Sequence, residues 1–349
     1  MTLLYNLIMA GVDLAALFRT GRNKSPSAWV LSVLGAGTVA LMLAIALGED
    51  RFGATRLAAY GLFLHGGIVL TGSAVVWWRR KRLVAVGSAT IVLLLAAVAV
   101  DAFLIEPTRL EVSRIRIRSP KIERPVRIVV LADLQTDRIG PYQRDVFRRV
   151  LKEEPDLVLL AGDYVQASEK KLDAVRGELA AFLHEIEFGR DFRVFAVRGN
   201  IDPTDWRDLF DGLEVEAVGS TRSFVLDGLR LTCLGLGDSY DPSLTMPCED
   251  HDRFHIVLGH VPNFALGHVD ADLLVAGHTH GGQVQLPWIG PLTTNSQVPR
   301  RWGAGLTDLP GGARLLVSRG VGMEGKYAPR LRFFCRPELV VIDLVPEEE

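Results

Sequence analysis

Three long runs without a charged residue, near the start of the chain, restrict its fold more than any other feature. They cover residues 25–48, 57–78 and 83–100, and the third extends to Ile105 if Asp101 lies near a boundary. An apolar run of about 18 residues or more is long enough to cross the hydrocarbon core of a bilayer as a helix. We therefore predict that residues 1–105 form a transmembrane region with three helices. Residues 1–18 are a fourth candidate that carries Asn6 and Asp13.

The basic residues around these runs predict an orientation. Arg19, Arg22 and Lys24 precede the first run, and residues 79–82 form a basic loop between the second and third. The remaining loop carries only Arg51 and Arg56. Because Lys and Arg gather on the cytoplasmic side of a membrane, residues 106 onward are expected outside the cytoplasm, in a multi-pass protein of the cell membrane. Four arginines between residues 109 and 118 argue the other way, but their alternation with Ile115 and Ile117 indicates a half-exposed strand.

The composition of the remainder is that of an ordinary globular protein. The chain has 349 residues, 48% of them hydrophobic, and the excess lies in residues 1–105. Residues 106–349 are enough for one sizeable domain. The formal net charge is −2 and no basic stripe is present, so nucleic acid is not an expected partner. Three cysteines form neither a disulfide framework nor a C-x-x-C metal site.

Five polar motifs follow five apolar runs in the second part of the chain. The runs are residues 128–132, 157–161, 192–197, 255–258 and 273–276, and they lead into Asp133-Leu134-Gln135, Gly162-Asp163, Gly199-Asn200, Gly259-His260 and Gly277-His278-Thr279-His280. Each motif thus lies where a buried strand ends, which is the edge at which sites of open α/β sheets gather. Asp, Asn and His are side chains that hold divalent cations.

The pattern of helices and strands predicts the architecture around these motifs. Residues 142–152 and 169–187 have helical apolar spacing, so the first half alternates strand and helix. The second half is richer in short strands, with a turn at Asp227-Gly228. We expect an α/β sandwich of two packed mixed β-sheets flanked by helices.

In these motifs the chain resembles the calcineurin-like metallophosphoesterase superfamily, whose pattern is roughly D-x-H, G-D, G-N-H-D/E, a lone His and G-H-x-H. The resemblance covers about residues 126–344. Gly281-Gly282-Gln283 and Val317-Ser318-Arg319-Gly320 look like the membrane-associated bacterial branch. The resemblance implies the same sandwich fold and a metal-dependent hydrolase of phosphoric ester or phosphoanhydride bonds.

The resemblance also implies a centre of two divalent cations, with Mn, Fe or Zn favoured by the mixed donors. Asp163 would bridge the ions, and Asp133 and His280 would complete one site. Asn200, His260 and His278 would complete the other. A hydroxide held between the ions would then attack phosphorus in line with the leaving oxygen. The implied catalytic residues are Asp163, Asn200, Asp202 and His260.

Two positions depart from the family pattern. Gln135 stands where a His is usual, and its neutral amide is a weaker donor, so it is a candidate ligand of a looser site. Ile201 stands where a His usually stabilises the developing charge or protonates the leaving oxygen. Asp202 follows it and has two possible roles: it acts through a water, or it orients the Asn200 loop.

The substrate is the least determined part of the sequence. Arg300, Arg301 and Arg319 are candidate phosphate-binding residues, with exposed loop charges as the alternative. A membrane anchor favours a lipid-linked or envelope phosphate substrate, cleaved at a phosphodiester or pyrophosphate bond. One alternative is a UDP-2,3-diacylglucosamine pyrophosphatase of lipid A synthesis, which needs a cytoplasmic site. Another, suggested by Gln135 and Ile201, is a metal-binding sensor or scaffold with low activity.

Overall fold

The computed structural model describes all residues except 24, 248–249, 326–327 and 348–349. The chain divides into two compact units. One consists of Met1–Ile105 and Glu324–Leu331, and the other of Glu106–Met323 and Arg332–Glu349. The first is called here the helical unit. The second, which contains the residues predicted to be catalytic, is called the catalytic unit.

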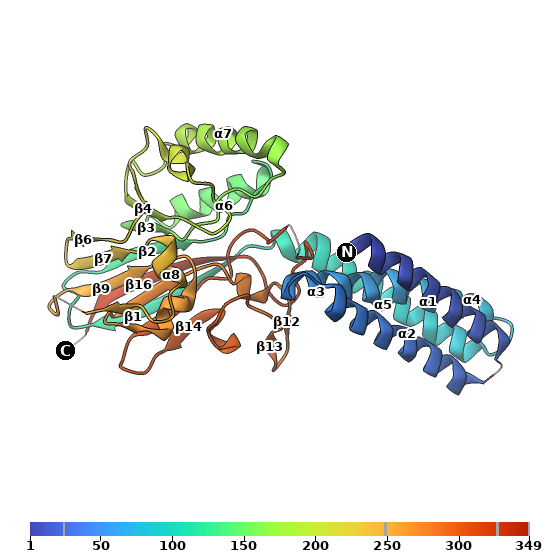
Figure 1. Ribbon diagram of the computed structural model, residues 1–349. Helices are drawn as coiled ribbons and strands as arrows, with labels where there is room; N and C mark the ends of the chain where they lie inside the picture. Colours follow the sequence, from blue (N-terminus) through green and yellow to red (C-terminus); the bar gives the residue numbers. More distant parts are fainter. Residues whose placement is uncertain (24, 248–249, 326–327, 348–349) are drawn as a thin grey trace. The chain divides into compact units, whose positions relative to one another are not determined.

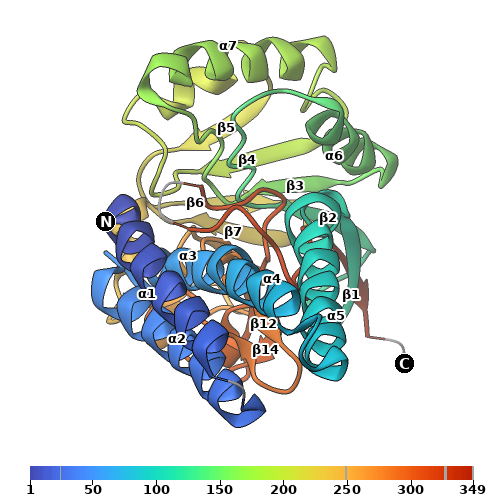
Figure 2. The ribbon, with the colours of Figure 1, turned by 90° about the vertical axis from the view of Figure 1, so that its right-hand side faces the viewer.

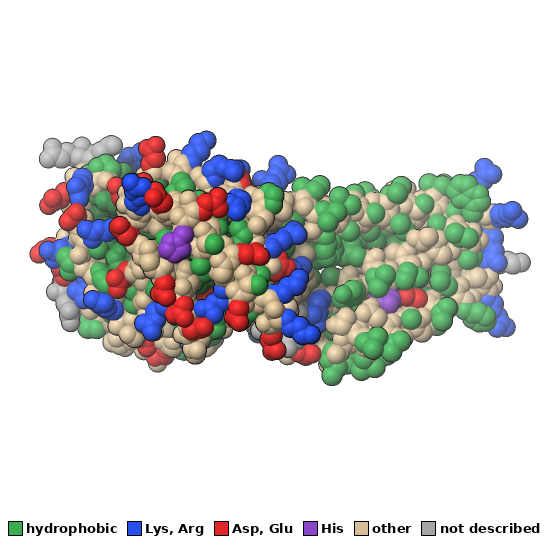
Figure 3. Space-filling model, turned by 90° about the horizontal axis from the view of Figure 1, so that it is seen from above, with side chains coloured by type: hydrophobic (Ala, Val, Ile, Leu, Met, Phe, Trp, Pro, Cys, Tyr) green, Lys and Arg blue, Asp and Glu red, His purple; other side chains and the backbone are tan. Residues whose placement is uncertain are grey.

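The helical unit is built from long apolar helices (Figures 1 and 2). They are α1 (Thr2–Arg22), α2 (Pro26–Leu47), α3 (Arg51–Ala59), which continues through the π-helix η1 (Tyr60–His65) into α4 (Gly66–Trp77), and α5 (Arg82–Val100), which continues into the π-helix η2 (Asp101–Ile105). Four helical segments are long and apolar enough to cross a membrane, namely Thr2–Arg22, Pro26–Leu47, Arg51–Trp77 and Arg82–Thr108. The fourth candidate of the sequence thus meets the same criterion as the other three. Hydrophobic side chains cover much of the visible surface of this unit, and Lys and Arg gather at one end (Figure 3).

A polar cluster lies inside the helical unit. His65 is buried, and its Nδ1 lies 2.7 Å from Asp13 Oδ2 while its Nε2 lies 2.9 Å from Asn6 Oδ1. The Tyr5 ring meets the His65 ring edge-on, and the Tyr5 hydroxyl donates to the Ala40 carbonyl. Polar groups bonded between apolar helices are favourable inside a membrane because they satisfy one another there. The cluster therefore ties α1 to η1 and α2.

Two six-stranded mixed sheets form the catalytic unit (Figure 1). The first has the order β1-β16-β2-β3-β4-β5, from β1 (Glu111–Ser119), β16 (Glu338–Pro346), β2 (Val126–Leu131), β3 (Leu157–Leu160), β4 (Arg193–Val197) and β5 (Val215–Val218). The second has the order β14-β15-β11-β9-β7-β6, from β14 (Gly305–Asp308), β15 (Arg314–Val317), β11 (Leu273–Ala276), β9 (Phe254–Leu258), β7 (Leu229–Cys233) and β6 (Arg222–Leu226). Strands β2 to β5 run parallel, as do β7, β9, β11 and β15.

The pleat of β2 divides the core into two layers, because successive side chains of a strand point to opposite faces. Ile128 and Val130 pack between the sheets with Ile256 and Val275 of the second sheet. The other face of the first sheet packs against α6 (Pro141–Lys152) and α7 (Glu169–Glu185), which cover it as an outer layer (Figure 2). The predicted sandwich and its two helices are confirmed.

Shorter elements connect these layers. They are η3 (Glu106–Thr108), η4 (Trp206–Phe210), α8 (Leu236–Tyr240), β8 (Thr245–Met246), η5 (Pro262–Leu266), β10 (His268–Val269), η6 (His280–Gly282), β12 (Gln285–Leu286), β13 (Gly290–Pro291) and η7 (Arg300–Trp302). β8 pairs with β10, and β12 pairs with β13 in a short hairpin.

Candidate metal centre

The carboxyl ends of parallel strands from both sheets bring the predicted ligands to one edge of the sandwich. Asp133 follows β2, Asp163 follows β3 and Asn200 follows β4 in the first sheet, while His260 follows β9 and His278 follows β11 in the second. Hydrogen bonds across the strand ends hold neighbouring loops together, since Asp133 N donates to Gly162 O and Gly277 N donates to His260 O. The folding of two apolar sheets therefore gathers polar side chains that are far apart in sequence.

Several of these residues have a left-handed backbone, which is rare outside glycine. The φ angle is 52° at Asp133, 35° at Gln135, 60° at Asp163, 69° at His278 and 50° at His280. Such a conformation costs about 1–2 kcal/mol per residue and persists only where the surrounding structure fixes it. This concentration of strain at one sheet edge is typical of a functional site.

The glycines of the G-D and G-N motifs allow two loops to meet. A Cβ on Gly162 would lie 2.6 Å from the backbone nitrogen of Gly199, and a Cβ on Gly199 would lie 2.0 Å from Asp163 Oδ1. Neither position has room for a side chain. The two glycines thus let Asp163 and Asn200 approach each other.

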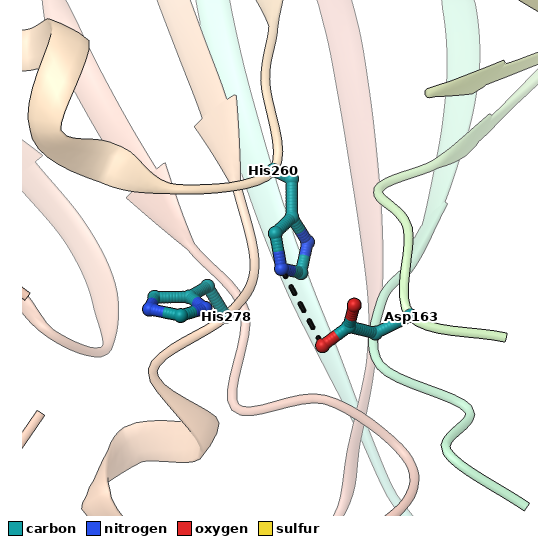
Figure 4. A group of neighbouring side chains, drawn as sticks. All are labelled: Asp163, His260 and His278. Carbon is teal, nitrogen blue, oxygen red and sulfur yellow. Dashed lines mark ion pairs between the residues drawn. The ribbon is translucent and has the colours of Figure 1, made fainter. Parts of the chain in front are cut away.

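Asp163, His260 and His278 form a buried cluster whose ligand atoms lie within 4.8 Å of one another (Figure 4). His260 Nε2 lies 3.4 Å from Asp163 Oδ2. Asn200 joins them from the exposed side, with its Oδ1 lying 2.9 Å from His260 Nε2 and 2.7 Å from His278 Nδ1.

The hydrogen bonds of the two rings show which nitrogens face this cluster with lone pairs. His260 Nδ1 lies 2.7 Å from the Ala161 carbonyl and His278 Nε2 lies 3.2 Å from the Asn295 carbonyl. A carbonyl only accepts, so each of these nitrogens carries the proton of a neutral ring. The other two nitrogens then direct lone pairs at Asn200 Oδ1, which is itself an acceptor. Lone pairs that converge in this way need a cation or a proton between them, and this donor set fits a divalent metal ion.

A second group of donors lies beside the first. His280 Nε2 is 3.9 Å from Asp133 Oδ1. Both ring nitrogens of His280 are buried, and neither has a hydrogen-bond partner within the described part of the chain. Gln135 Nε2 donates to Asp163 Oδ2 at 3.0 Å, so this amide also lies at the centre. Buried imidazole nitrogens are costly without a partner. A metal ion bound between His280 and Asp133 would satisfy one of them, Nε2, which faces Asp133.

The charges of the centre shift one another's pKa values in opposite directions. Burial raises the pKa of Asp133 to about 8. Burial also opposes the charged form of His260, but Asp163 outweighs it and raises the pKa of His260 to about 9. Burial alone would raise the pKa of Asp163, but the charge of His260 outweighs burial and lowers this pKa to about 2. Burial and the neighbouring His260 lower the pKa of His278 to about 4. The pocket thus favours a positive charge at Asp163, which a metal ion would supply.

Asp202 holds the backbone of the centre in place. Its Oδ2 accepts from Asp163 N at 2.8 Å and from Gly199 N at 2.7 Å, and its Oδ1 accepts from Tyr164 N at 2.9 Å. The side chain is buried, and the backbone donors occupy both of its oxygens. Of the two roles weighed for Asp202, this geometry favours orientation of the loops.

The structure does not bring the three predicted arginines to this cluster. Arg319 Nη2 lies 2.9 Å from Glu338 Oε1 and 3.2 Å from Glu111 Oε2, so two carboxylates already surround it. Arg300 and Arg301 line a separate cavity of about 820 Å³ beside the β12–β13 hairpin. Of the described residues that line this cavity, none is a predicted metal ligand. Their role toward phosphate stays a prediction.

Sequence reasoning missed Arg332. This side chain is completely buried and donates to the carbonyl groups of Arg319, Gly320, Gly322 and Cys335. It fixes the loop that passes behind Asp133, where Gly322 N donates to Asp133 O. Arg332 is flanked by Leu331 and Phe333, and this local sequence gives no signal of such a role.

Comparison with known proteins shows which family and which relatives this chain resembles. Residues 126–282 match the calcineurin-like phosphoesterase family. The chain is 29% identical over 235 residues to phosphodiesterase YaeI of Escherichia coli strain K12, covering 63% of this chain and 83% of that protein. It is 24% identical over 308 residues to UDP-2,3-diacylglucosamine pyrophosphatase LpxG of Chlamydia trachomatis, covering 68% of this chain and 90% of that protein. Among solved structures, the E. coli phosphoesterase Yfce shares 16% identity at a TM-score of 0.32, over 57% of this chain and 84% of that one.

Proposed function

Because residues 126–282 match the calcineurin-like phosphoesterase family, we propose that the chain is a membrane-anchored hydrolase of a lipid-linked or envelope phosphate substrate. The family is one of metal-dependent phosphoester hydrolases with a binuclear centre. The proposal adds the anchor, the bond and the ligands. The bond is a phosphodiester or a pyrophosphate, and the catalytic domain is residues 106–349.

The observation that carries the proposal is the convergence of buried lone pairs at one sheet edge. Asp163 contacts one member of each donor group, His260 and Gln135, and is proposed as the shared ligand. Asp133, Gln135 and His280 are proposed for one cation, and Asn200, His260 and His278 for the other. Two bound cations would polarise the phosphoryl oxygens and lower the pKa of a water held between them. Mixed carboxylate, amide and imidazole donors favour Mn, Fe or Zn.

The chain's own residues have distinct parts in this proposal. Asp163 and Asp133 concentrate negative charge where the cations bind, and backbone carbonyls fix the tautomers of His260 and His278. Asp202 holds the loops of Asp163 and Asn200 in register. Ile201 offers no proton to a leaving oxygen, so a leaving group that needs none, such as that of a phosphoanhydride, suits this site best.

The anchor supports a substrate at the bilayer. Four helical segments are long and apolar enough to span a membrane. The C-terminal end of α1 and residues 79–82 carry most of the flanking basic charge. This favours their placement in the cytoplasm and that of the catalytic unit outside it.

A second candidate is a UDP-2,3-diacylglucosamine pyrophosphatase. The similarity to LpxG extends over 90% of that protein and favours this reading. It requires a cytoplasmic site, because its nucleotide-linked substrate is cytoplasmic. A topology reporter joined after residue 349 separates the two candidates.

The test uses the full chain in lipid nanodiscs, loaded in turn with Mn, Zn, Fe or Mg. Hydrolysis of bis-p-nitrophenyl phosphate, p-nitrophenyl phosphate and UDP-2,3-diacylglucosamine is measured. Asp163→Ala should abolish turnover. His255→Ala should retain it, because His255 is equally buried but is bonded to Thr232 and Asp270 outside the centre. Metal binding without turnover on any substrate would instead support a sensor or scaffold.

A further inference from the structure

We propose that the β12–β13 hairpin and Arg300–Arg301 form a surface of the catalytic unit that docks on anionic lipid headgroups of the bilayer. Residues 285–301 are called here the interfacial loop. The inference builds on the proposed membrane anchor but is independent of hydrolysis.

The tip of the interfacial loop exposes large apolar side chains. Trp288 is fully exposed, and Ile289 is 60% exposed. Phe334, which lies beside the hairpin, is also 60% exposed. Water disfavours such a group of side chains, and exposed apolar patches mark surfaces that meet a partner or a membrane. Tryptophan in particular favours the headgroup region, where its ring is apolar and its N–H stays hydrated.

The backbone holds two of these aromatic residues outward at a cost. Trp288 has a φ of 64° and Phe334 a φ of 50°. A left-handed backbone is a genuine outlier for bulky residues and is maintained only where contacts enforce it. Here Gln285 N donates to Phe333 O, and Phe333 N donates to Gln283 O, so the segment of Phe334 is fastened to the hairpin. The strain presents two aromatic rings to the outside rather than burying them.

Positive charge lies next to the apolar tip. Arg300 and Arg301 are exposed, and they line the cavity of about 820 Å³ together with Trp288, Ile289 and Phe334. Arg300 donates to the Pro291 carbonyl at 3.4 Å, and within the described part of the chain no carboxylate forms an ion pair with either arginine. Guanidinium groups recognise phosphate through paired hydrogen bonds, so an anionic headgroup complements this edge of the loop.

The interfacial loop is also part of the metal centre's wall. It begins just after η6, which contains His280, and the Asn295 carbonyl within it is bonded to His278 Nε2. The next turn is fixed as well, because Thr279 Oγ1 donates to Gly303 O. A membrane bound by this loop would therefore lie beside the cluster that holds the cations.

Chain connectivity keeps the catalytic unit close to the bilayer. The candidate span Arg82–Thr108 leads almost directly into β1, which starts at Glu111. Only two residues lie between the span and β1. Because a residue spans at most about 3.5 Å, they can hold the two apart by only about 10 Å. Under the proposed anchor, the first strand of the unit therefore starts within a few residues of the bilayer.

The test measures where the loop lies in vesicles. The full chain, with Cys248→Ser so that the remaining native cysteines are the buried Cys233 and Cys335, receives a nitroxide at Ile289→Cys. Matched labels are placed at Val225→Cys, an exposed apolar residue of β6, and at Leu94→Cys on α5. Collision rates with oxygen and with a nickel chelate are compared in vesicles of phosphatidylcholine and of an equal mixture with phosphatidylglycerol. Oxygen concentrates in lipid and the chelate in water.

The expected result is an oxygen-to-nickel ratio at Ile289→Cys several-fold above that at Val225→Cys. This ratio should rise further with phosphatidylglycerol, and Arg300→Gln with Arg301→Gln should remove that rise. Trp288→Ser should lower the ratio in both lipids. A lipid-like ratio at Leu94→Cys with a water-like ratio at Ile289→Cys would overturn the inference alone. A water-like ratio at Leu94→Cys would overturn the anchor and the inference together. Low collision rates with both reagents at Ile289→Cys would mean that protein covers the interfacial loop. This result too would overturn the proposed docking on lipid headgroups.

Discussion

Asp202→Asn tests whether a buried carboxylate organises the metal centre through the backbone. Three N–H groups donate to this side chain, those of Asp163, Tyr164 and Gly199, over 2.7–2.9 Å. Burial, followed by the charge of Asp163, raises the pKa of Asp202 to about 6, so the carboxylate is ionised at neutral pH. An asparagine has one acceptor oxygen, and its NH₂ group would face at least one of the three donors.

The magnitude follows from these bonds. One buried N–H left without a partner costs about 1–3 kcal/mol, and replacing a charged acceptor by a neutral one weakens the remaining bonds by about 1 kcal/mol in total or more. We expect a loss of about 3 kcal/mol in the free energy of unfolding. For a domain of this size, a loss of about 3 kcal/mol lowers Tm by roughly 6–12 °C. Turnover should fall as well, because the loops of Asp163 and Asn200 lose their common support.

Thermal unfolding of the catalytic unit, followed by near-UV circular dichroism of the full chain in nanodiscs, measures this effect. Asp343→Asn is the control, since Asp343 forms a partly exposed ion pair with Arg127 at 2.8 Å. Such a pair contributes about 0–1 kcal/mol. An Asp202→Asn variant with the Tm of the control, but with slower turnover and a shifted pH profile, would refute the reasoning. It would mean that Asp202 transfers a proton through a water.

Three further results are expected. Metal at about a hundred times its Kd should stabilise the native chain by about 2.7 kcal/mol, and His280→Ala should lose much of the resulting rise in Tm while His255→Ala keeps it. In the metal-free protein burial opposes a charged His260, but Asp163 raises its pKa to about 9. Metal ligation needs the neutral His260 ring and an ionised Asp133, whose pKa burial raises to about 8. Binding at pH 7 should therefore release protons and tighten as pH rises toward 9. Calorimetry in buffers of different ionisation enthalpy would show the proton release as a binding enthalpy that varies with the buffer. A buffer-independent binding enthalpy would contradict the proton release. Ile201→His should accelerate alkyl phosphodiesters by about tenfold or more and p-nitrophenyl diesters little, whereas equal gains would exclude a role in protonating the leaving group.

Local patterns predicted the fold well where one segment determines its own structure. The run around Ile128–Val130 is apolar on both faces and so could be identified as a buried strand. Its neighbours in the sheet were not predictable, because β16 returns from the far end of the chain to pair between β1 and β2. The order of strands depends on contacts over long sequence separations, which no local periodicity records.

The same limit applies to individual side chains. Arg319 was a candidate for phosphate because it follows the last predicted metal ligands in sequence. Its partners in the structure are Glu111 and Glu338, which come from opposite ends of the catalytic unit. Arg332 was missed for the corresponding reason, since the carbonyl groups that it holds belong to a loop whose path is fixed only in the folded chain. Sequence predicts which residue types gather at a sheet edge, and the fold decides which charges are left for a ligand.

The departure at Ile201 shows how the fold limits the effect of one substitution. The Ile201 N–H donates to Asp163 Oδ1 at 3.0 Å, and the Asp202 side chain next to it holds the N–H of Asp163. Residue 201 thus orients the proposed shared ligand through its backbone, whatever side chain it carries. The His278 N–H similarly donates to both oxygens of Asp133 at 3.0 Å. Because the backbone orients both carboxylates, loss of the histidine at 201 removes a proton donor without disturbing the proposed metal site. The isoleucine at position 201 is therefore expected to narrow the range of leaving groups. It is a weaker argument for an inactive scaffold than the sequence pattern suggests.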